Sequence, residues 1–224
     1  MDLKFDFSFK TKVSNSFRQK SLIGQYDLPE QGIEQKFKGD YKLPDKWNIG
    51  LIVGNSGSGK SSVAKKCFGE IHQLEWNNES IIENFDKSLT MDQITFILGS
   101  VGFNSIPYWL KPFSVLSNGE KSRVELARLL AEKEFSIYDE FTSMVDRDVA
   151  KSMSFSVQKA ARKLNKKLIL ISCHKDIEEW LEPCWILDMD KNVFFCQKKE
   201  KEQKDLYLKF QNVEKKDGIS IKNI

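Results

Sequence analysis

The fold of this chain is decided by the stretch Trp47-Asn48-Ile49-Gly50-Leu51-Ile52-Val53-Gly54-Asn55-Ser56-Gly57-Ser58-Gly59-Lys60-Ser61. Its first half is a short run that is apolar on both faces, which is typical of a strand buried inside a parallel sheet. Its second half is rich in glycine and ends in lysine and serine, and the pattern of residues 61–68 predicts a helix. A strand, a turn of the form G-x-x-x-x-G-K-S and a helix together indicate a phosphate-binding loop.

The residue types of this loop suit the phosphates of a nucleotide. Glycine lets successive backbone N–H groups turn toward phosphate oxygens without a clash from a Cβ atom. The helix after the loop points its positive N-terminal end at the same place. We expect Lys60 to neutralise the β and γ phosphates and Ser61 to offer its hydroxyl to Mg²⁺. The predicted nucleotide contacts are Gly54, Asn55, Ser56, Gly57, Ser58, Gly59, Lys60, Ser61 and Ser62.

Three further segments carry polar side chains at predicted element boundaries. The run Leu116-Ser117-Asn118-Gly119-Glu120 precedes an amphipathic helix over 120–132, whose N-terminus favours an anion. A predicted strand over 135–138 ends in Asp139 and Glu140. The first carboxylate could hold Mg²⁺ through water and the second could polarise an attacking water, although such a pair could instead cap a helix. Another predicted strand, over 167–172, is followed by His174.

In order and residue type these motifs resemble those of the ATP-binding-cassette (ABC) ATPases. The resemblance covers residues from about 47 to 185 and rests on the phosphate loop, the signature at 117–120, the acid pair and His174. It implies an α/β P-loop fold with a mixed sheet, an N-terminal antiparallel β segment and a helical subdomain. It also implies that the nucleotide is ATP rather than GTP, bound with Mg²⁺ and hydrolysed.

The resemblance further implies a role for each polar residue of the predicted site. Lys60, Glu140 and His174 would be the catalytic residues, and His174 would contact the γ-phosphate and help to position the attacking water. Ser61 and Asp139 would be the metal ligands.

The resemblance also implies a homodimer that forms when ATP is bound. In the family, the signature faces the ATP held by the phosphate loop of a second subunit. Here the signature residues are Ser117, Gly119 and Glu120. Asp146 matches an aspartate of the loop that crosses the dimer interface. Two ATP molecules would then lie between two copies of the chain, and hydrolysis would loosen the pair.

The sequence departs from the ABC ATPase pattern at positions that help to distinguish one subclass of these ATPases from another. Asn118 stands where a glycine is usual, Glu120 where transporters commonly have glutamine, and Phe141 where a proline is usual. The sequence interval between the phosphate loop and the signature is short compared with that of transporter cassettes. We therefore expect a trimmed helical subdomain over about 70–130.

Two family positions have no obvious counterpart. Gln73 and Gln93 are candidates for the glutamine that senses metal and γ-phosphate, and Tyr26 is the candidate for the aromatic residue that stacks on adenine.

The chain divides into three expected parts. Residues 1–46 form an N-terminal β segment with strands over 3–9 and 34–41, and residues 47–195 form the ATPase core. Further helices are predicted over 91–100, 148–164 and 177–181. Residues 196–224 form a charged tail.

The composition and the apolar runs of the sequence argue against a membrane-spanning protein, a secreted protein and a zinc-binding protein. The 224 residues are 40% hydrophobic and 30% charged, and 35 Lys and Arg against 32 Asp and Glu give a net charge of +3, which points to no particular partner. No apolar run approaches the about 20 residues that cross a bilayer, and the N-terminus lacks the apolar core of a signal peptide. The four cysteines form no CxxC pair, so we expect reduced thiols, no zinc and a cytoplasmic setting.

The finer resemblance is to soluble cassettes of phages, bacteria and archaea that are sometimes fused to an acetyltransferase-like domain. It is carried by Val101-Gly102-Phe103 and Glu179-Trp180-Leu181-Glu182-Pro183 besides the motifs above. We therefore expect a soluble ATPase that acts as a switch on another macromolecule. An acetyltransferase-like or nucleic-acid-processing partner stays open. The alternatives are the ATPase subunit of a membrane transporter and a DNA-directed ATPase of the repair or chromosome-maintenance type, although no long coiled coil is present.

Overall fold

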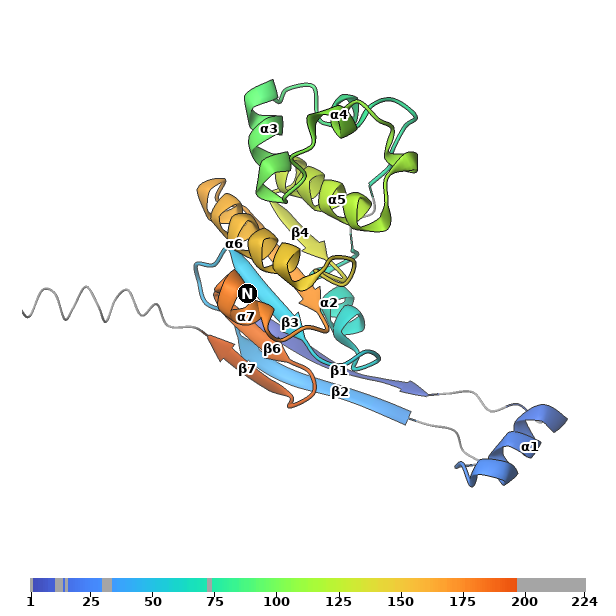
Figure 1. Ribbon diagram of the computed structural model, residues 1–224. Helices are drawn as coiled ribbons and strands as arrows, with labels where there is room; N and C mark the ends of the chain where they lie inside the picture. The colour runs from blue at the N-terminus through green and yellow to red at the C-terminus, as the bar shows by residue number, and fades with distance from the viewer. Residues whose placement is uncertain (1, 11–13, 15, 30–33, 72–73, 197–224) are drawn as a thin grey trace, which may run out of the picture.

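The computed structural model describes residues 2–10, 14, 16–29, 34–71 and 74–196, and a five-stranded sheet lies at its centre (Figure 1). The strand order is β4-β5-β3-β6-β7. The first four strands are parallel, and β7 pairs antiparallel with β6, so the predicted α/β fold with a mixed sheet is confirmed. The strands are β3 (Ile49–Val53), β4 (Phe135–Tyr138), β5 (Lys167–Ser172), β6 (Trp185–Asp188) and β7 (Val193–Cys196).

Both faces of the sheet are covered, because alternate strand residues point to opposite sides. Leu51 and Leu170 pack in one core with apolar residues of α3, α5, α6 and α7, whereas Ile52 and Ile171 pack in a second core with α2 and the N-terminal strands. This double burial explains why β3 is apolar at every position. The helices are α2 (Lys60–Phe68), α3 (Met91–Ser100), α5 (Asn118–Glu132), α6 (Arg147–Lys163) and α7 (Ile177–Leu181).

The N-terminal strands form the predicted antiparallel hairpin, β1 (Asp2–Lys10) with β2 (Glu34–Lys42). Leu3, Phe5 and Phe37 are buried against the second face of the sheet. Tyr41 stacks on Phe194 of β7, with 5.2 Å between ring centroids. The hairpin therefore shares a core with the sheet instead of forming a separate body.

The helical subdomain lies between α2 and β4 in the sequence and at the top of Figure 1. It contains α3, α4 (Ile106–Trp109), the start of α5 and two short 3-10 turns, Ile81–Asn84 and Phe113–Val115. The expected helical subdomain is therefore present, and its shortening relative to other cassettes stays a prediction. Within the described ranges, no helix combines the length and the apolar character needed to cross a membrane.

Helix α4 and the two 3-10 turns were not predicted from the sequence, and neither were three further elements. Helix α1 (Phe17–Tyr26) lies beyond the tip of the hairpin in Figure 1 and has no buried residue. Because it packs against no core, its sequence has no apolar stripe from which a helix could be predicted. Strands β6 and β7 have four residues each, too few for a periodic pattern to identify. The predicted tail lies outside the described residues from 197 onward.

Candidate functional site

Three loops at one edge of the sheet carry residues that the sequence predicts to be functional. The phosphate loop follows β3, the acid pair follows β4, and His174 follows β5. These strands are parallel and adjacent in the order β4-β5-β3, so their carboxyl ends meet at the same edge. The acid pair does not lie on the strand directly beside the phosphate loop, because β5 separates β4 from β3.

The phosphate loop is closed by its own lysine. The Nζ atom of Lys60 donates to the carbonyl oxygens of Gly54 and Asn55, at 2.8 Å and 2.7 Å, and the side chain is buried. Gly59 has a φ of +85°, and a Cβ atom there would lie 2.2 Å from the ring of Phe37. A larger residue at position 59 would both strain the backbone and displace the hairpin.

The loop and its surroundings fit a nucleotide bound with Mg²⁺. The Oγ atom of Ser58 is buried and has no hydrogen-bond partner within the described part of the chain, so it is available to a phosphate oxygen. Helix α2 begins at Lys60 and presents its N-terminus to the loop. The hydroxyl of Ser61 and the carboxylate of Asp139 are the hard oxygen ligands that Mg²⁺ prefers. The described residues contain no group of three or more His, Cys, Asp or Glu that could hold a metal by itself. Mg²⁺ would therefore take its other ligands from phosphates and water.

The acid pair is held by an unusual backbone conformation. Glu140 has a φ of +56° and the buried Thr142 a φ of +68°, a region that β-branched residues rarely adopt. One carboxylate oxygen of Glu140 accepts from the Ser143 hydroxyl at 2.6 Å, and the Glu140 N–H donates to Asp139 at 2.9 Å. Neither acid caps a helix; Asp146 caps α6. Backbone strain of this kind clusters at functional sites. Ser143 supports the Glu140 carboxylate, a role that the sequence did not reveal.

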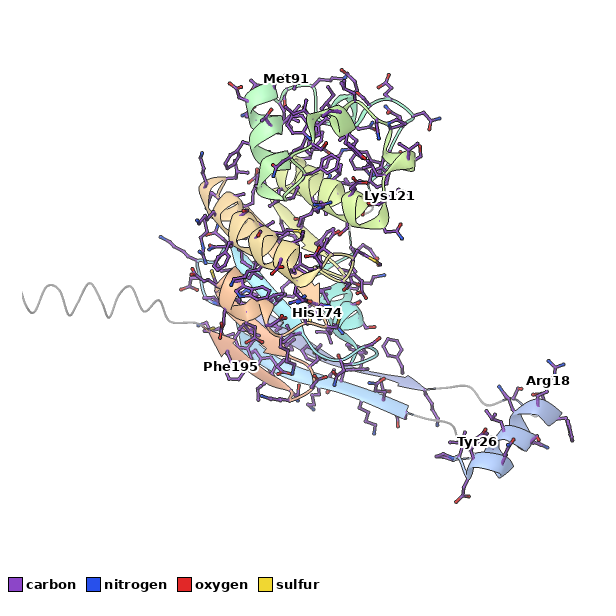
Figure 2. All side chains as sticks on the ribbon, viewed as in Figure 1. Arg18, Tyr26, Met91, Lys121, His174 and Phe195 are labelled. Carbon is purple, nitrogen blue, oxygen red and sulfur yellow. The ribbon has the colours of Figure 1, made fainter. Side chains whose placement is uncertain are left out.

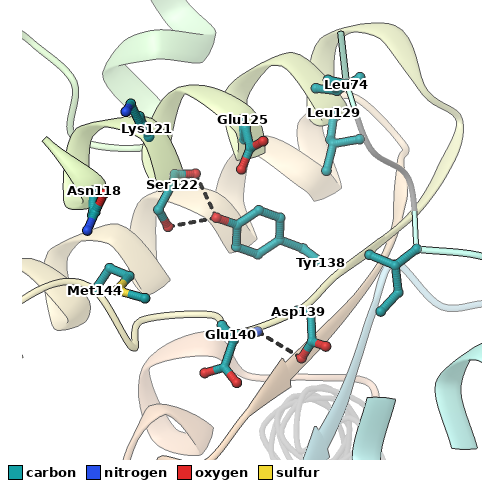
Figure 3. A pocket seen from close by; sticks show the side chains of 11 residues that line it. Leu74, Asn118, Lys121, Ser122, Glu125, Leu129, Tyr138, Asp139, Glu140 and Met144 are labelled. Atoms are coloured by element: carbon teal, nitrogen blue, oxygen red, sulfur yellow. Dashed lines mark hydrogen bonds between the residues drawn. The ribbon is translucent and has the colours of Figure 1, made fainter. Parts of the chain in front are cut away.

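A cavity of about 390 Å³ lies between α5 and the end of β4 (Figure 3). Asn118, Asp139, Glu140 and Met144 line it, so the start of the signature helix and the acid pair face the same space. On its wall, the hydroxyls of Tyr138 and Ser122 lie 2.6 Å apart, and burial raises the pKa of Tyr138.

The loop that carries His174 is tied to the acid-pair loop by one buried serine. The hydroxyl of Ser172 donates to the carbonyl oxygen of Phe141 at 2.9 Å and accepts from the His174 N–H at 3.1 Å. The Phe141 N–H also donates to Ile171 of β5 at 2.8 Å. His174 itself is half-buried. Ser172 therefore fixes the backbone of His174 relative to Glu140.

We expect Ser172→Ala to lower the rate of ATP hydrolysis and to reduce the free energy of unfolding by about 1–3 kcal/mol, because the buried Phe141 carbonyl and the partly buried His174 N–H lose their partner. Urea denaturation and a phosphate-release assay measure the two effects. The matched control is Ser154→Ala, since Ser154 is fully buried in α6 and donates only to Ala150 within the helix. Equal losses of ATPase activity in both variants would contradict a specific role for Ser172.

The signature residues form a capping box at the start of α5. The Ser117 hydroxyl accepts from the Glu120 N–H, while the Glu120 carboxylate accepts the Ser117 N–H at 2.9 Å, a bond that lowers the pKa of Glu120. A Cβ atom on Gly119 would lie 2.7 Å from the carbonyl oxygen of Met144, so glycine is required where α5 meets the loop before Asp146. Asp146 caps α6 by accepting from the Val149 N–H at 2.9 Å.

Within the described residues, no hydrogen bond or ion pair joins the signature or Asp146 to the phosphate loop of the same chain. Ser117 and Asp146 are exposed.

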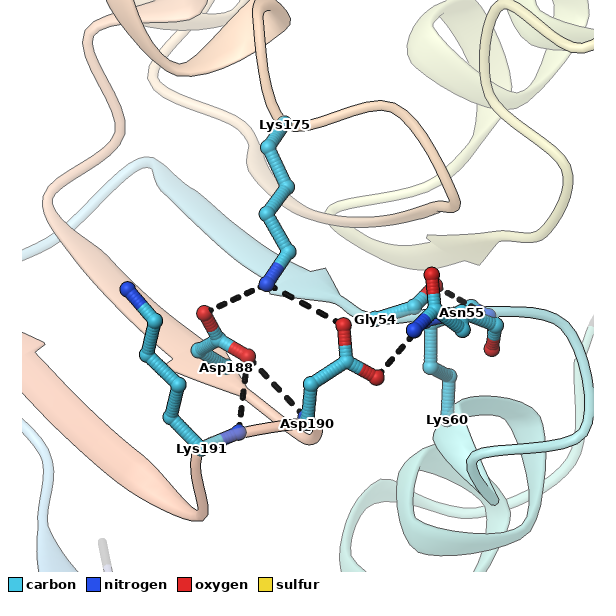
Figure 4. A network of polar contacts seen from close by, with 7 residues as sticks. All are labelled: Gly54, Asn55, Lys60, Lys175, Asp188, Asp190 and Lys191. Carbon is cyan, nitrogen blue, oxygen red and sulfur yellow. Dashed lines mark hydrogen bonds and ion pairs between the residues drawn. The ribbon is translucent and has the colours of Figure 1, made fainter.

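A polar network beside the phosphate loop was not predicted from the sequence (Figure 4). The Asn55 N–H donates to the Asp190 carboxylate at 2.8 Å. Lys175, next to His174 in the chain, lies 2.7 Å from the carboxylate of Asp188 and 3.1 Å from that of Asp190. Burial opposes the charged form of Asp188, but bonds from Lys175 and two backbone N–H groups outweigh it and lower the pKa of that carboxyl. Motif spacing does not reveal these residues, because they belong to no local pattern.

Two sequence assignments are not supported. Tyr26 is 62% exposed on α1, beyond the hairpin and apart from the sheet edge that carries His174 (Figure 2). Gln93 caps α3, where its side chain accepts from the Thr90 N–H at 2.8 Å. Gln73 lies outside the described residues.

Comparisons with known proteins show which proteins this chain is similar to. No protein-family model matches the chain. The energy-coupling factor transporter ATP-binding protein EcfA1 of Staphylococcus aureus is 27% identical over an alignment of 184 positions, and the match covers 64% of this chain and 68% of the relative. A dimeric structure of the bacterial ABC transporter cassette MJ0796 has a TM-score of 0.54 at 13% identity and covers 73% of this chain and 89% of that one. The chain is homologous to an ABC transporter ATP-binding protein, and its fold is that of an ABC ATPase cassette.

The chain is also similar to MJ0796 in a second structure. That dimer, described as a post-hydrolysis state bound to ADP and Pi, has a TM-score of 0.59 at 11% identity and covers 88% of this chain and 99% of its own. At such low identity the likeness to MJ0796 shows the fold alone.

Proposed function

We propose that this ABC cassette binds Mg-ATP and hydrolyses it in a composite site formed by two copies of the chain, and that it acts in the cytoplasm as a switch on another macromolecule. The observation that carries the proposal is the shared sheet edge, where β3, β4 and β5 bring together the phosphate loop, the acid pair and His174.

Each residue at this edge has a role that follows from its chemistry. Lys60 and the loop N–H groups bind the phosphates, and the buried Ser58 hydroxyl adds a donor. Ser61 and Asp139 would hold Mg²⁺, which would neutralise charge on the phosphates.

Glu140 accepts a proton from the attacking water, and the Ser143 hydroxyl orients its carboxylate. His174, held through Ser172, orients the γ-phosphate and that water.

The composite site is supported by the position of the signature. Ser117 is the N-cap of the 15-residue helix α5, whose N-terminus favours an anion, and the Ser117 side chain is exposed. The ATP of a second copy would satisfy this N-terminus, and the cavity lined by Asn118 and Glu140 opens beside it. The dimeric form of MJ0796 favours the same arrangement.

Mixing two inactive variants tests the composite site directly. Lys60→Ala disables the phosphate loop, and Ser117→Arg disables the signature, so each homodimer should be inactive. A mixed dimer contains one site with an intact loop from one chain and an intact signature from the other. We expect an equal mixture to recover up to about a quarter of wild-type ATP hydrolysis. Circular dichroism would verify that each variant folds, and the absence of any recovery would contradict the composite site.

A second candidate function is that of the ATPase subunit of a membrane transporter. EcfA1 is a transporter ATP-binding protein, and the helical subdomain exposes Ile106, Leu110 and Val115, by 64%, 67% and 62%. Exposed apolar side chains gathered in one region suit a protein partner. The short sequence interval between Lys60 and Ser117, which predicts a trimmed subdomain, favours the switch. Co-purification of the chain with a membrane protein would favour the transporter.

The response of ATP hydrolysis to DNA distinguishes a DNA-directed ATPase from the switch and from the transporter subunit. ATP hydrolysis measured with and without double-stranded DNA should be the same for a switch on a protein partner. Stimulation by DNA would favour the DNA-directed function.

A further inference from the structure

The turn between β6 and β7 places two carboxylates next to the phosphate loop. Asp188 ends β6 and is 5% exposed. Its Oδ1 atom accepts from the N–H groups of Asp190 and Lys191, at 2.9 Å and 3.1 Å, and its Oδ2 atom accepts from Lys175 at 2.7 Å. The turn is therefore folded around one buried carboxylate, which fixes where Asp190 points.

Asp190 and Lys60 hold the two ends of one residue of the phosphate loop. The Asn55 N–H donates to Asp190 at 2.8 Å, and the Asn55 carbonyl oxygen accepts from Lys60 at 2.7 Å. Bonds to charged groups are stronger than those between neutral groups, so the backbone of Asn55 is well restrained. Figure 4 shows these bonds continuing from Asp190 to Lys175.

Lys175 connects this turn to the catalytic histidine. It follows His174 directly, and its ammonium group lies between Asp188 and Asp190. The backbone of His174 is held by Ser172 on one side, whereas Lys175 provides an anchor on the other. Among the described residues, Lys175 is the residue of the His174 loop that forms ion pairs with the β6–β7 turn. That turn contacts the phosphate loop through Asp190.

We propose that Lys175, Asp188 and Asp190 are positioning residues that set the distance between His174 and the phosphate loop during ATP hydrolysis. This inference rests on the proposed function. Lys175 acts on His174, while Asp190 acts on the phosphate loop through Asn55, and Asp188 aligns both.

The arrangement predicts different effects on kcat and KM. Without the Lys175 ammonium, Asp190 still accepts from Asn55, so the phosphate loop keeps its shape and the KM for ATP changes little. The His174 loop loses its anchor, so kcat falls. Small misplacements of a catalytic group cost up to about a hundredfold in rate.

The experiment compares kcat, KM and the midpoint of thermal unfolding for Lys175→Met, Lys175→Arg and the double variant Lys175→Met/Asp188→Asn, which leaves no lone buried carboxylate. We expect kcat about 10- to 100-fold lower in Lys175→Met and in the double variant, with KM within about twofold of wild type. Lys175→Arg should recover much of kcat, because a guanidinium can bridge the two carboxylates. The matched control is Arg162→Met, since Arg162 is similarly exposed and pairs with Glu182 at 3.2 Å, at the α6–α7 contact.

Three results would overturn the inference: wild-type kcat in the double variant, a loss in Lys175→Met no greater than in Arg162→Met, or no recovery in Lys175→Arg. A wild-type protein that hydrolyses no ATP would instead contradict the proposed function, so the two failures are distinguishable.

Discussion

Glu140→Gln is expected to lower the rate of ATP hydrolysis by about a hundred- to ten-thousand-fold, the range that a positioned general base contributes. The amide of glutamine can still accept from the Ser143 hydroxyl, so the loop with its positive φ should keep its shape. The amide cannot accept a proton from water. The phosphate contacts remain, and the variant should therefore accumulate as an ATP-bound dimer.

Single-turnover hydrolysis and light scattering after size exclusion, with and without Mg-ATP, measure these two effects. Glu179→Gln, on the exposed side of α7, is the control for loss of a carboxylate, and it should behave as wild type. Hydrolysis by Glu140→Gln at the wild-type rate would show that the base lies elsewhere. A monomer at saturating ATP would argue against the dimer.

Lys60→Ala is expected to weaken ATP binding by about 10- to 100-fold, because a bond between an ammonium and a phosphate contributes about 1.5–3 kcal/mol. In the described structure the same ammonium holds the carbonyl oxygens of Gly54 and Asn55. Its loss therefore also loosens the loop, and the N–H groups become less well ordered for phosphate.

Titration calorimetry with a slowly hydrolysed ATP analogue measures the affinity. Lys66→Ala removes an exposed lysine from the same helix and should leave the affinity unchanged. Equal affinities for wild type and Lys60→Ala would refute the assignment of the loop. A lower unfolding midpoint without a change in affinity would indicate a purely structural lysine.

Much of the site was predictable because its chemistry follows short-range patterns. A buried strand, glycines and a lysine lie within one continuous stretch, so the phosphate loop could be assigned without knowing any distant contact. Asp139 was predicted because it follows an apolar run that forms a strand, whereas the role of His174 was predicted from the resemblance to ABC ATPases. The capping box of Ser117 and Glu120 likewise depends on residues three apart.

What the sequence by itself determined is therefore the strands that end at the candidate site and the residue types at their ends. Only the tertiary structure decided how those ends are held together. Asn55 and Asp190 are 135 positions apart, and Ser172 and Phe141 are 31 apart, so no local spacing reveals either bond. Both bonds depend on which strands pair, and pairing is settled when the whole sheet buries its two apolar faces.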